Sequence, residues 1–363
     1  MAKSAARIQV VEEPNLANPY ARLLVGGYRR TGRSAHLSVA GLSRDGGQVI
    51  HLQWPETLLA WRRAGNRRYR SAPEVALRDL KERQKSAPLV YTVHNLEPHN
   101  THDPSILALY AAIVTLPDIF VHHGQSSIAP FVSRYPQTRE RVHLVAKHGP
   151  YPAPTSHQQA DFRQGLRKAI GLEYGRRLVL NFGRQRPNKH YSFMDDIASR
   201  LPSSEFAFLS IGRSSGPPAG SPLQQAGLGV IRAIRHGLAR HRSATINARP
   251  SNRLSSRLFA AADVVLLPHT GGINSGVLSL AISHGCRVVY PDLGNLRHQS
   301  GAWVHAYAYR AGDPQSAAEA LIEAFDAPDD DTHASWRLWL QENSWERHAE
   351  VVGGAIDSFN ESS

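Results

Sequence analysis

The sequence predicts an α/β chain of two domains, each built around a parallel β-sheet. Short apolar runs alternate with amphipathic stretches along the whole chain, which is the pattern of β-α units in parallel sheets. The 363 residues exceed what one hydrophobic core normally organises. A polar, proline-containing stretch at residues 149–155 separates two series of such units, and we interpret it as a linker.

Individual elements follow from the apolar runs and their spacing. The expected strands of the first series are residues 7–11, 36–38, 49–52, 89–93, 119–122 and 142–145. Those of the second series are residues 178–182, 205–211, 244–247, 264–267, 287–290 and 303–306. Helices are expected at 20–30, 158–170, 255–261 and 276–283, and after Ser344, which is a favourable N-cap residue. The predicted domains are 1–155 and 156–343, and we expect a terminal helix, 344–363, to pack back on the first.

Composition narrows the class of protein. A hydrophobic content of 41% and a charged content of 20% are typical of a globular protein. The single cysteine, Cys286, permits no intrachain disulfide, which fits a reducing compartment. We find neither an apolar run of membrane-spanning length nor a secretory signal pattern, so we expect a cytoplasmic protein. The net charge of +12 is concentrated in residues 1–150, which hold 20 Lys and Arg against 11 Asp and Glu; such a half attracts polyanions.

A strand that ends in a basic loop is the strongest functional signal. The predicted strand 178–182 ends at Gly183, and Arg184, Arg186 and Lys189 follow. Ligands of open α/β sheets bind beyond the carboxyl ends of the strands, where a diphosphate needs fixed positive charge. The alternative is a solvated basic loop without a ligand.

A second signal follows the strand 264–267. A glycine-rich turn leads through Asn274, Ser275 and Gly276 into a predicted helix. Backbone N–H groups and the helix dipole favour an anion at such a helix start. A tight loop without a ligand is again the alternative, but both signals lie at strand ends of the same domain.

Together these motifs resemble glycosyltransferases of the GT-B "group 1" type. The matching positions are Gly183 and Arg184 with Lys189, residues 262–268, and 285–289, with weaker matches at 18–24, 92–95, 147–149 and near Trp345. The resemblance implies two Rossmann-like domains that face across a cleft, with a C-terminal helix crossing back. It also implies that Arg184 and Lys189 contact the donor diphosphate, that residues 274–276 hold phosphate or ribose, and that Arg249 lies near the nucleotide base. These enzymes generally use a nucleotide sugar as substrate and need no metal or other cofactor.

The chain departs from the retaining branch of that superfamily, which carries a pair of glutamates across the glycine-rich turn. No glutamate occurs between Glu205 and Glu319. In this respect the turn is more similar to that of bacterial exopolysaccharide β-mannosyltransferases of the xanthan type. That resemblance implies an inverting mechanism with GDP-mannose as donor.

An inverting enzyme needs a general base on the acceptor side. The predicted strand 89–93 is followed by His94, Glu97 and His99, and either His94 or Glu97 suits this role. We expect Asn18, His99 and His123 to line the acceptor cleft. The alternative is that these polar residues only cap the strand and line a wet surface.

A basic, aromatic stretch at residues 51–70 suggests a membrane contact. Trp54, Trp61, Arg62 and Arg63 belong to it, and interleaved arginines and aromatics suit an anionic bilayer surface. A solvated basic helix packed by its tryptophans is the alternative. Single-stranded nucleic acid also binds such side chains, but no nucleic-acid-binding motif accompanies them.

The leading hypothesis is therefore a glycosyltransferase that acts at the inner face of the cell membrane. We expect it to move a sugar, with GDP-mannose as best candidate donor, onto a glycan or lipid-linked acceptor in exopolysaccharide or cell-surface glycan synthesis. The partners expected are the nucleotide sugar, the acceptor and an anionic membrane surface, and not nucleic acid. The alternatives are a GT-B-like sugar-nucleotide epimerase and a non-catalytic basic protein that binds nucleic acid or membranes.

Overall fold

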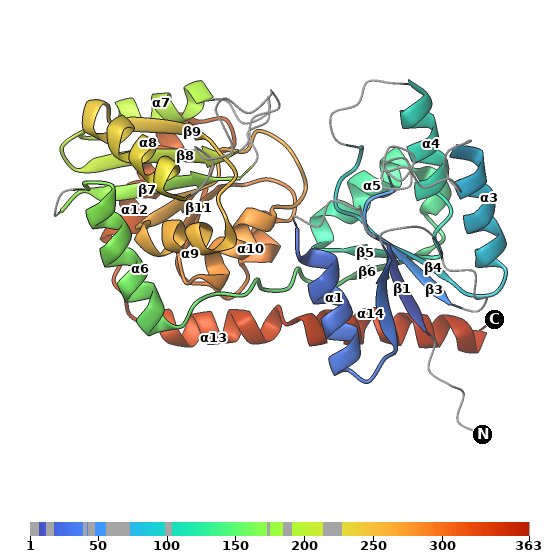
Figure 1. Ribbon diagram of the computed structural model, residues 1–363. Helices are drawn as coiled ribbons and strands as arrows, with labels where there is room; N and C mark the ends of the chain where they lie inside the picture. Colours follow the sequence, from blue (N-terminus) through green and yellow to red (C-terminus); the bar gives the residue numbers. More distant parts are fainter. Residues whose placement is uncertain are drawn as a thin grey trace. The chain divides into compact units, whose positions relative to one another are not determined.

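The computed structural model describes residues 7–11, 18–38, 42, 48–55, 73–98, 104–172, 175–183, 191–212 and 227–362. The chain divides into two compact units. Unit 1 comprises Met1–Gly149 and Gln341–Ser363, and unit 2 comprises Pro150–Leu340. Unit 1 is therefore discontinuous in sequence, and each unit is described by itself below (Figure 1).

Unit 1 is a six-stranded parallel sheet in the order β2-β1-β3-β4-β5-β6. Its strands are β1 (Ile8–Val11), β2 (Ala35–Ser38), β3 (Val49–Leu52), β4 (Leu89–Thr92), β5 (Ile119–His122) and β6 (Val142–Val145). Its helices are α1 (Tyr20–Arg30), α3 (Pro73–Gln84), α4 (Pro104–Val114), α5 (Ile128–Arg134) and α14 (Trp345–Ser362). Four of the strands are buried at every position, as expected for a parallel sheet covered on both faces.

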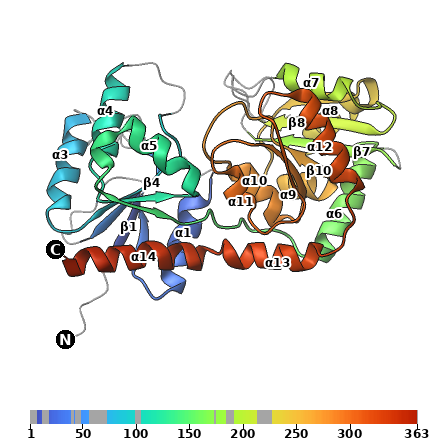
Figure 2. The same ribbon diagram turned by 180° about the vertical axis from the view of Figure 1, so that it is seen from behind.

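Unit 2 holds a second six-stranded parallel sheet, in the order β12-β11-β10-β7-β8-β9. Its strands are β7 (Arg177–Phe182), β8 (Phe206–Gly212), β9 (Ser243–Asn247), β10 (Val264–Leu266), β11 (Arg287–Pro291) and β12 (Ala306–Tyr309). Its helices are α6 (Ser156–Ala169), α7 (Tyr191–Ser199), α8 (Gly227–Arg240), α9 (Asn252–Ala261), α10 (Gly276–Ser283), α11 (Leu296–Ser300), α12 (Pro314–Asp326) and α13 (Thr332–Glu342), which continues into unit 1. One apolar core joins α6, α8, α9 and α10 to one face of this sheet. A second core joins α7 and α12 to the other face, which Figure 2 presents.

The predicted α/β class and the strand positions are confirmed, with one shift. The strand expected at 303–306 runs instead over Ala306–Tyr309. Trp303 lies before it and is buried, and its indole Nε1 donates to the carbonyl of Cys286 at 3.0 Å. The apolar run was misread because a tryptophan that anchors a loop in the core looks the same as one that starts a strand.

Within the described residues, no helix combines the length and the apolar character that a membrane span requires. The terminal helix α14 belongs to unit 1, where it packs against α1, and the two helices cross (Figure 1). Its start is capped as expected, because the Ser344 hydroxyl accepts a hydrogen bond from the backbone N–H of Arg347 at 3.2 Å. Trp345, Val352 and Ile356 of α14 are buried in the unit 1 core.

Close approach of α1 and α14 depends on Gly27. A Cβ atom at this position would lie 2.4 Å from the backbone carbonyl oxygen of Trp345, whereas one at Gly26 would meet only the flexible end of Arg30, at 3.0 Å. We expect Gly27→Ala to destabilise unit 1 by about 3 kcal/mol, since backbone cannot yield as a side chain can. Gly26→Ala is the matched control, and we expect it to be neutral or slightly stabilising through helix propensity. Urea denaturation of both variants tests this; equal stabilities would contradict the packing described.

Candidate functional site

Both sheets contain a topological switch point. In unit 2 the chain starts at β7, proceeds outward through β8 and β9, and returns to β10 on the other side of β7. In unit 1 the corresponding strands are β1 and β3. Loops diverge at the carboxyl ends of such strand pairs and leave a crevice there for a ligand. The residues predicted as functional follow these strands and their neighbours, so the topology brings them to the carboxyl edge of each sheet.

The turn at residues 274–276 starts α10 at the unit 2 switch point. Ser275 is its N-cap, and the hydroxyl accepts a hydrogen bond from the Leu278 N–H at 3.4 Å. The Ser275 N–H is also occupied, since it donates to Gln299 Oε1 at 3.0 Å. The N–H groups of Gly276 and Val277 have no hydrogen-bond partner within the described chain, and Gly276 is exposed. Two of the helix-start N–H groups are thus available to an anion.

A second layer of residues fixes this turn. Asn295 Nδ2 donates to Asn274 Oδ1 at 2.9 Å, and the Asn295 N–H donates to the Ile273 carbonyl at 2.8 Å. Gly294, whose φ is +50°, packs so closely that a Cβ atom there would lie 2.6 Å from Ile273 Cα. The Gln299 side chain is buried, which holds its Oε1 on the turn. The turn is therefore preorganised before any ligand arrives.

The other predicted donor contacts have different outcomes. Gly183 follows β7 with a φ of +109°, a left-handed conformation that favours glycine. Arg184 and Lys189 lie outside the described residues. Arg249 follows β9 at the carboxyl edge of the sheet and is exposed. The phenol oxygen of Tyr151 was not predicted as a site atom, yet it lies 3.1 Å from the position of a Cβ atom on Gly276.

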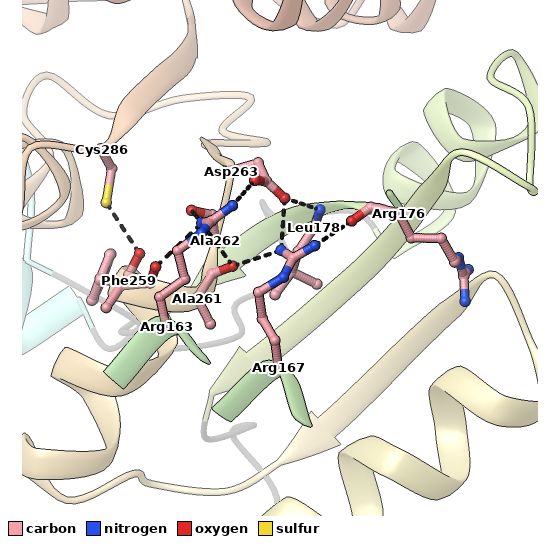
Figure 3. Close-up of polar contacts among 10 residues, drawn as sticks. Arg163, Arg167, Arg176, Leu178, Phe259, Ala261, Ala262, Asp263 and Cys286 are labelled. Carbon is pink, nitrogen blue, oxygen red and sulfur yellow. Dashed lines mark hydrogen bonds and ion pairs between the residues drawn. The ribbon is translucent and has the colours of Figure 1, made fainter. Parts of the chain in front are cut away.

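Asp263, part of the motif at 262–268, lies at the opposite, amino edge of the sheet (Figure 3). Its carboxylate pairs with Arg163 and Arg167 of α6 and accepts the backbone N–H of Leu178 at 2.6 Å. Arg163 also donates to the Ala262 carbonyl, at 3.1 Å, beyond the end of α9. The aspartate therefore joins α6, α9 and β7, and its role is structural.

Removal of this carboxylate charge will destabilise unit 2. We expect Asp263→Asn to cost about 2 kcal/mol, because it leaves two half-buried guanidinium groups without their anion. Asp292→Asn is the control, since Asp292 pairs with Arg297 at 3.4 Å and both side chains are more than half exposed, so its loss costs at most a few tenths of a kcal/mol. Urea midpoints of the two variants measure the difference. An Asp263 variant as stable as its control would show that the network contributes nothing.

In unit 1 the carboxyl edge of the sheet gathers a histidine cluster, His94, His123, His148 and His348. The rings of His94 and His123 lie 5.5 Å apart, and those of His148 and His348 lie 5.3 and 5.9 Å from His123. Tyr20 lies among them, and its hydroxyl is 3.3 Å from His123 Nε2. All four histidines are buried.

The backbone at 146–149 fixes the tautomer of three of these imidazoles. His123, His148 and His348 each place Nδ1 within 3.0 Å of a carbonyl oxygen, of Ala146, Gly149 and Lys147 respectively. A carbonyl only accepts, so each Nδ1 carries the proton. Burial lowers the pKa of His148 and of His348 to about 4. Burial also lowers the pKa of His123 well below its usual range, and the neighbouring imidazoles lower it further.

His94, the fourth member of the cluster, hydrogen-bonds to a side chain. Its Nε2 donates to Gln53 Oε1 at 3.0 Å, so the basic lone pair is on Nδ1. Trp54 stacks on the His94 ring at 4.2 Å with an interplanar angle of 11°. Trp54, which we predicted to face a membrane, reaches this imidazole because the strand β3 that precedes it lies beside β4.

Glu97, the other candidate base, has a different environment. Its carboxylate pairs with Arg134 of α5 at 2.8 Å, and both side chains are more than half exposed. The pair borders a cavity of about 340 Å³ between α4 and α5, lined also by Tyr110 and Tyr135. Tyr135 donates to the Leu96 carbonyl at 2.7 Å and so holds the loop that carries both His94 and Glu97.

The remaining predicted residues are placed as follows. Asn18 precedes α1, and its Oδ1 accepts the backbone N–H of Tyr20 at 3.1 Å. His99, Trp61, Arg62 and Arg63 lie outside the described residues. Among the described residues, no group of three or more His, Cys, Asp or Glu side chains is arranged to hold a metal ion.

Sequence reasoning missed three members of the cluster as site residues, Tyr20, His148 and His348. Tyr20 and His148 stand inside the stretches 18–24 and 147–149 that carry the family resemblance. His348 lies three residues after Trp345, whose ring centroid is 4.9 Å from that of Tyr20. It reaches the cluster from the far end of the chain, and only the docking of α14 reveals it.

Comparison with solved structures places this fold among known ones. Sucrose-phosphate synthase from Thermosynechococcus elongatus matches 99% of this chain and 100% of its own, with a TM-score of 0.66 and 14% identity. Anabaena Alr3699/HepE in complex with UDP matches 97% of this chain and 100% of its own, with a TM-score of 0.63 and 13% identity. A UDP-forming α,α-trehalose-phosphate synthase from Burkholderia vietnamiensis matches 99% of this chain and 100% of its own, with a TM-score of 0.62 and 12% identity. The chain has the GT-B fold. No protein-family model and no curated protein matches the sequence.

Proposed function

We propose that this chain is a glycosyltransferase that transfers a sugar from a nucleoside-diphosphate sugar to an acceptor hydroxyl. The observation that carries the proposal is the preorganised 274–276 turn at the unit 2 switch point, with the free N–H groups of Gly276 and Val277. A diphosphate fits these donors and the positive end of the α10 dipole. Solved structures of the same fold include one in complex with UDP and one bound to ADP and acarbose.

In this proposal, unit 2 stabilises the leaving group. When the bond from the anomeric carbon to the β-phosphate oxygen breaks, its electron pair goes to the nucleoside diphosphate, which becomes more negative. We propose that Arg184, Lys189 and the α10 start stabilise this charge, which is worth most in the transition state. Arg249 is proposed to contact the nucleotide base or ribose.

For unit 1 we propose that the histidine cluster binds the acceptor and that His94 is the general base. A neutral imidazole can accept the hydroxyl proton while the acceptor oxygen bonds to the anomeric carbon. Gln53 fixes the tautomer whose basic lone pair is on Nδ1. Glu97 is the less suitable base because its carboxylate is already engaged by Arg134, and we propose that it orients the acceptor, together with Asn18 and His99.

The finer assignment comes from the sequence alone. We propose an inverting enzyme with GDP-mannose as first candidate donor and a lipid-linked or glycan acceptor at the cytoplasmic membrane face. The absence of glutamate between Glu205 and Glu319 supports inversion. The UDP in the Anabaena protein makes UDP-sugars the competing donor class.

A ligand screen tests the proposal. Melting temperature and nucleotide release are measured with UDP-, GDP- and ADP-sugars; a donor at about 100 times its Kd stabilises the protein by about 2.7 kcal/mol. We expect one nucleotide class to raise the melting temperature, and Arg184→Ala with Lys189→Ala to abolish the effect. Arg310→Ala with Arg337→Ala is the control for lost charge in unit 2. The proposal fails if no sugar nucleotide binds or is cleaved.

A further inference from the structure

A second feature of unit 2 is a long stretch without any negative charge. Residues 206–262 contain eight arginines and no aspartate or glutamate. The stretch supplies α8 and α9, which pack on the same face of the unit 2 sheet as α6 (Figure 1). Uncompensated positive charge of this density is costly to gather on a surface unless an anionic partner meets it.

The helix α8 separates its apolar and basic residues. Val230, Ile231, Ile234 and Leu238 are buried in the unit 2 core. Leu228, Arg232 and Arg235, at positions i, i+4 and i+7, share a helix face that borders this buried stripe. All three are exposed, and Leu228, at 75%, is the most exposed large apolar side chain among the described residues.

Neighbouring helices extend this surface. The Arg235 side chain lies 3.7 Å from the position of a Cβ atom on Gly171, and that of Arg257, on α9, lies 4.0 Å from the equivalent position on Gly165. Lys168 of α6 is exposed between these two glycines in sequence. We define the basic face as Leu228, Arg232 and Arg235 of α8, Lys168 of α6 and Arg257 of α9.

The cations of the basic face have no acidic partner among the residues that the structure describes. None of the four makes an ion pair with a described residue. The nearby carboxylate of Asp263 is already shared by Arg163 and Arg167. Elsewhere in unit 2, by contrast, Arg287, Arg297 and Arg310 each have an aspartate partner.

We propose that the basic face docks unit 2 on an anionic lipid bilayer. Exposed guanidinium groups would contact lipid phosphates, and Leu228 would enter the headgroup region from the same helix face. Charge complementarity argues for an anionic partner, and the exposed Leu228 on the same helix face as Arg232 and Arg235 argues for lipid. A nucleic acid is less suited, because the face offers no aromatic ring on which a base could stack.

The proposal deepens the proposed function, which places the acceptor at a membrane, and it assigns a bilayer contact to unit 2. It does not depend on the identity of the donor. Vesicle binding requires no sugar nucleotide, and donor binding requires no vesicle. A failure of one proposal is therefore distinguishable from a failure of the other.

The test is sedimentation of the full chain with phosphatidylcholine vesicles, with or without phosphatidylglycerol. We expect binding only to the anionic vesicles, weakened by salt. Arg232→Glu with Arg235→Glu should reduce the fraction bound at least tenfold, since each basic residue near the surface contributes about fivefold. Arg200→Glu with Arg337→Glu changes the net charge equally on exposed residues outside the basic face and should retain binding. Leu228→Gln should weaken binding a few-fold without changing its dependence on salt.

Three results would overturn the proposal. The first is a protein that does not bind anionic vesicles. The second is that the variant at Arg232 and Arg235 and the variant at Arg200 and Arg337 lose, or retain, binding to the same extent. Either outcome would show that vesicle binding does not depend on the basic face. The third is salt-dependent binding to single-stranded RNA that is lost in the Arg232 and Arg235 variant while vesicle binding persists. Melting temperatures of both double variants within a few degrees of the parent show that each remains folded.

Discussion

Lowering the pH from 7.5 to 5 is expected to destabilise unit 1 by several kcal/mol. Five of its histidines are buried and neutral: His51, His122, His123, His148 and His348. Burial lowers the pKa of each, to about 3 for His122 and to about 4 for His148 and His348. Hydrogen-bond geometry agrees, since His122 and His51 are held by side-chain partners at 3.1 Å or less.

The direction follows from proton binding. Below pH 6.5 these imidazoles gain a proton in the unfolded chain, but in the folded protein their lowered pKa values keep them neutral to lower pH. The protein therefore keeps its full free energy of unfolding above pH 6.5 and loses part of it as the pH falls below that value. Each imidazole that stays neutral in the folded protein costs about 1.4 kcal/mol of stability per pH unit below 6.5, so a few of them suffice for a loss of several kcal/mol.

Urea denaturation between pH 5 and 8 measures this slope, and hydrogen exchange of unit 1 peptides assigns it to that unit. His348→Gln removes one buried titrating group and should flatten the slope below pH 6.5 by about one proton. His333→Gln, at an exposed position of α13, should leave it unchanged. A stability that is constant down to pH 5 would show that these imidazoles are charged, or hydrated, in the folded state.

Replacing His94 with glutamine is expected to lower kcat at least about 100-fold, the usual contribution of a general base. Donor KM should change little, because the residue is proposed to act on the acceptor proton and not on the nucleotide. The matched control is His143→Gln: His143, on β6, contacts His122 of β5 and the Thr138 carbonyl and does not belong to the histidine cluster. Steady-state kinetics of both variants, with melting temperatures, separate catalysis from folding. Full activity in His94→Gln would remove it as the base.

Variants of Gln53 give a graded version of the same test. Gln53→Leu removes the acceptor that fixes the His94 tautomer, and we expect about a tenfold loss of kcat with the melting temperature little changed. Gln53→Glu places a carboxylate at the same atom, which favours the imidazolium and should move the acidic limb of the kcat/KM profile to higher pH. An unchanged profile in Gln53→Glu would contradict a titrating role for His94.

The spacing of apolar residues, and the glycines and serines between apolar runs, were sufficient to predict the fold. Strand runs such as Ile119–His122 are apolar on both faces because helices cover both sides of a parallel sheet. Glycine after a strand and serine before a helix then located the turn at 274–276, and the structure shows Ser275 capping α10 as expected. These features are local, so a single stretch of sequence contains the information.

The residues that hold each candidate site in place could not be predicted from a single stretch of sequence. Gln299 reaches the Ser275 N–H across 24 residues, and Gln53 reaches His94 across 41. An isolated glutamine gives no signal of its partner, because its amide suits almost any surface position. The same holds for Asp263, whose place in the motif at 262–268 gave no sign of its two arginine partners at the amino edge of the sheet.

The discontinuity of unit 1 has a consequence for how the chain acquires its structure during synthesis. Unit 2 is a continuous segment, Pro150–Leu340, whereas the unit 1 core includes Trp345, Val352 and Ile356 from the end of the chain. A ribosome therefore releases every residue of unit 2 before unit 1 can close around α14. Until then the face of α1 that carries Gly27 is uncovered, so the N-terminal segment, although made first, completes its fold last, and the open α1 face is where a chaperone would have time to bind.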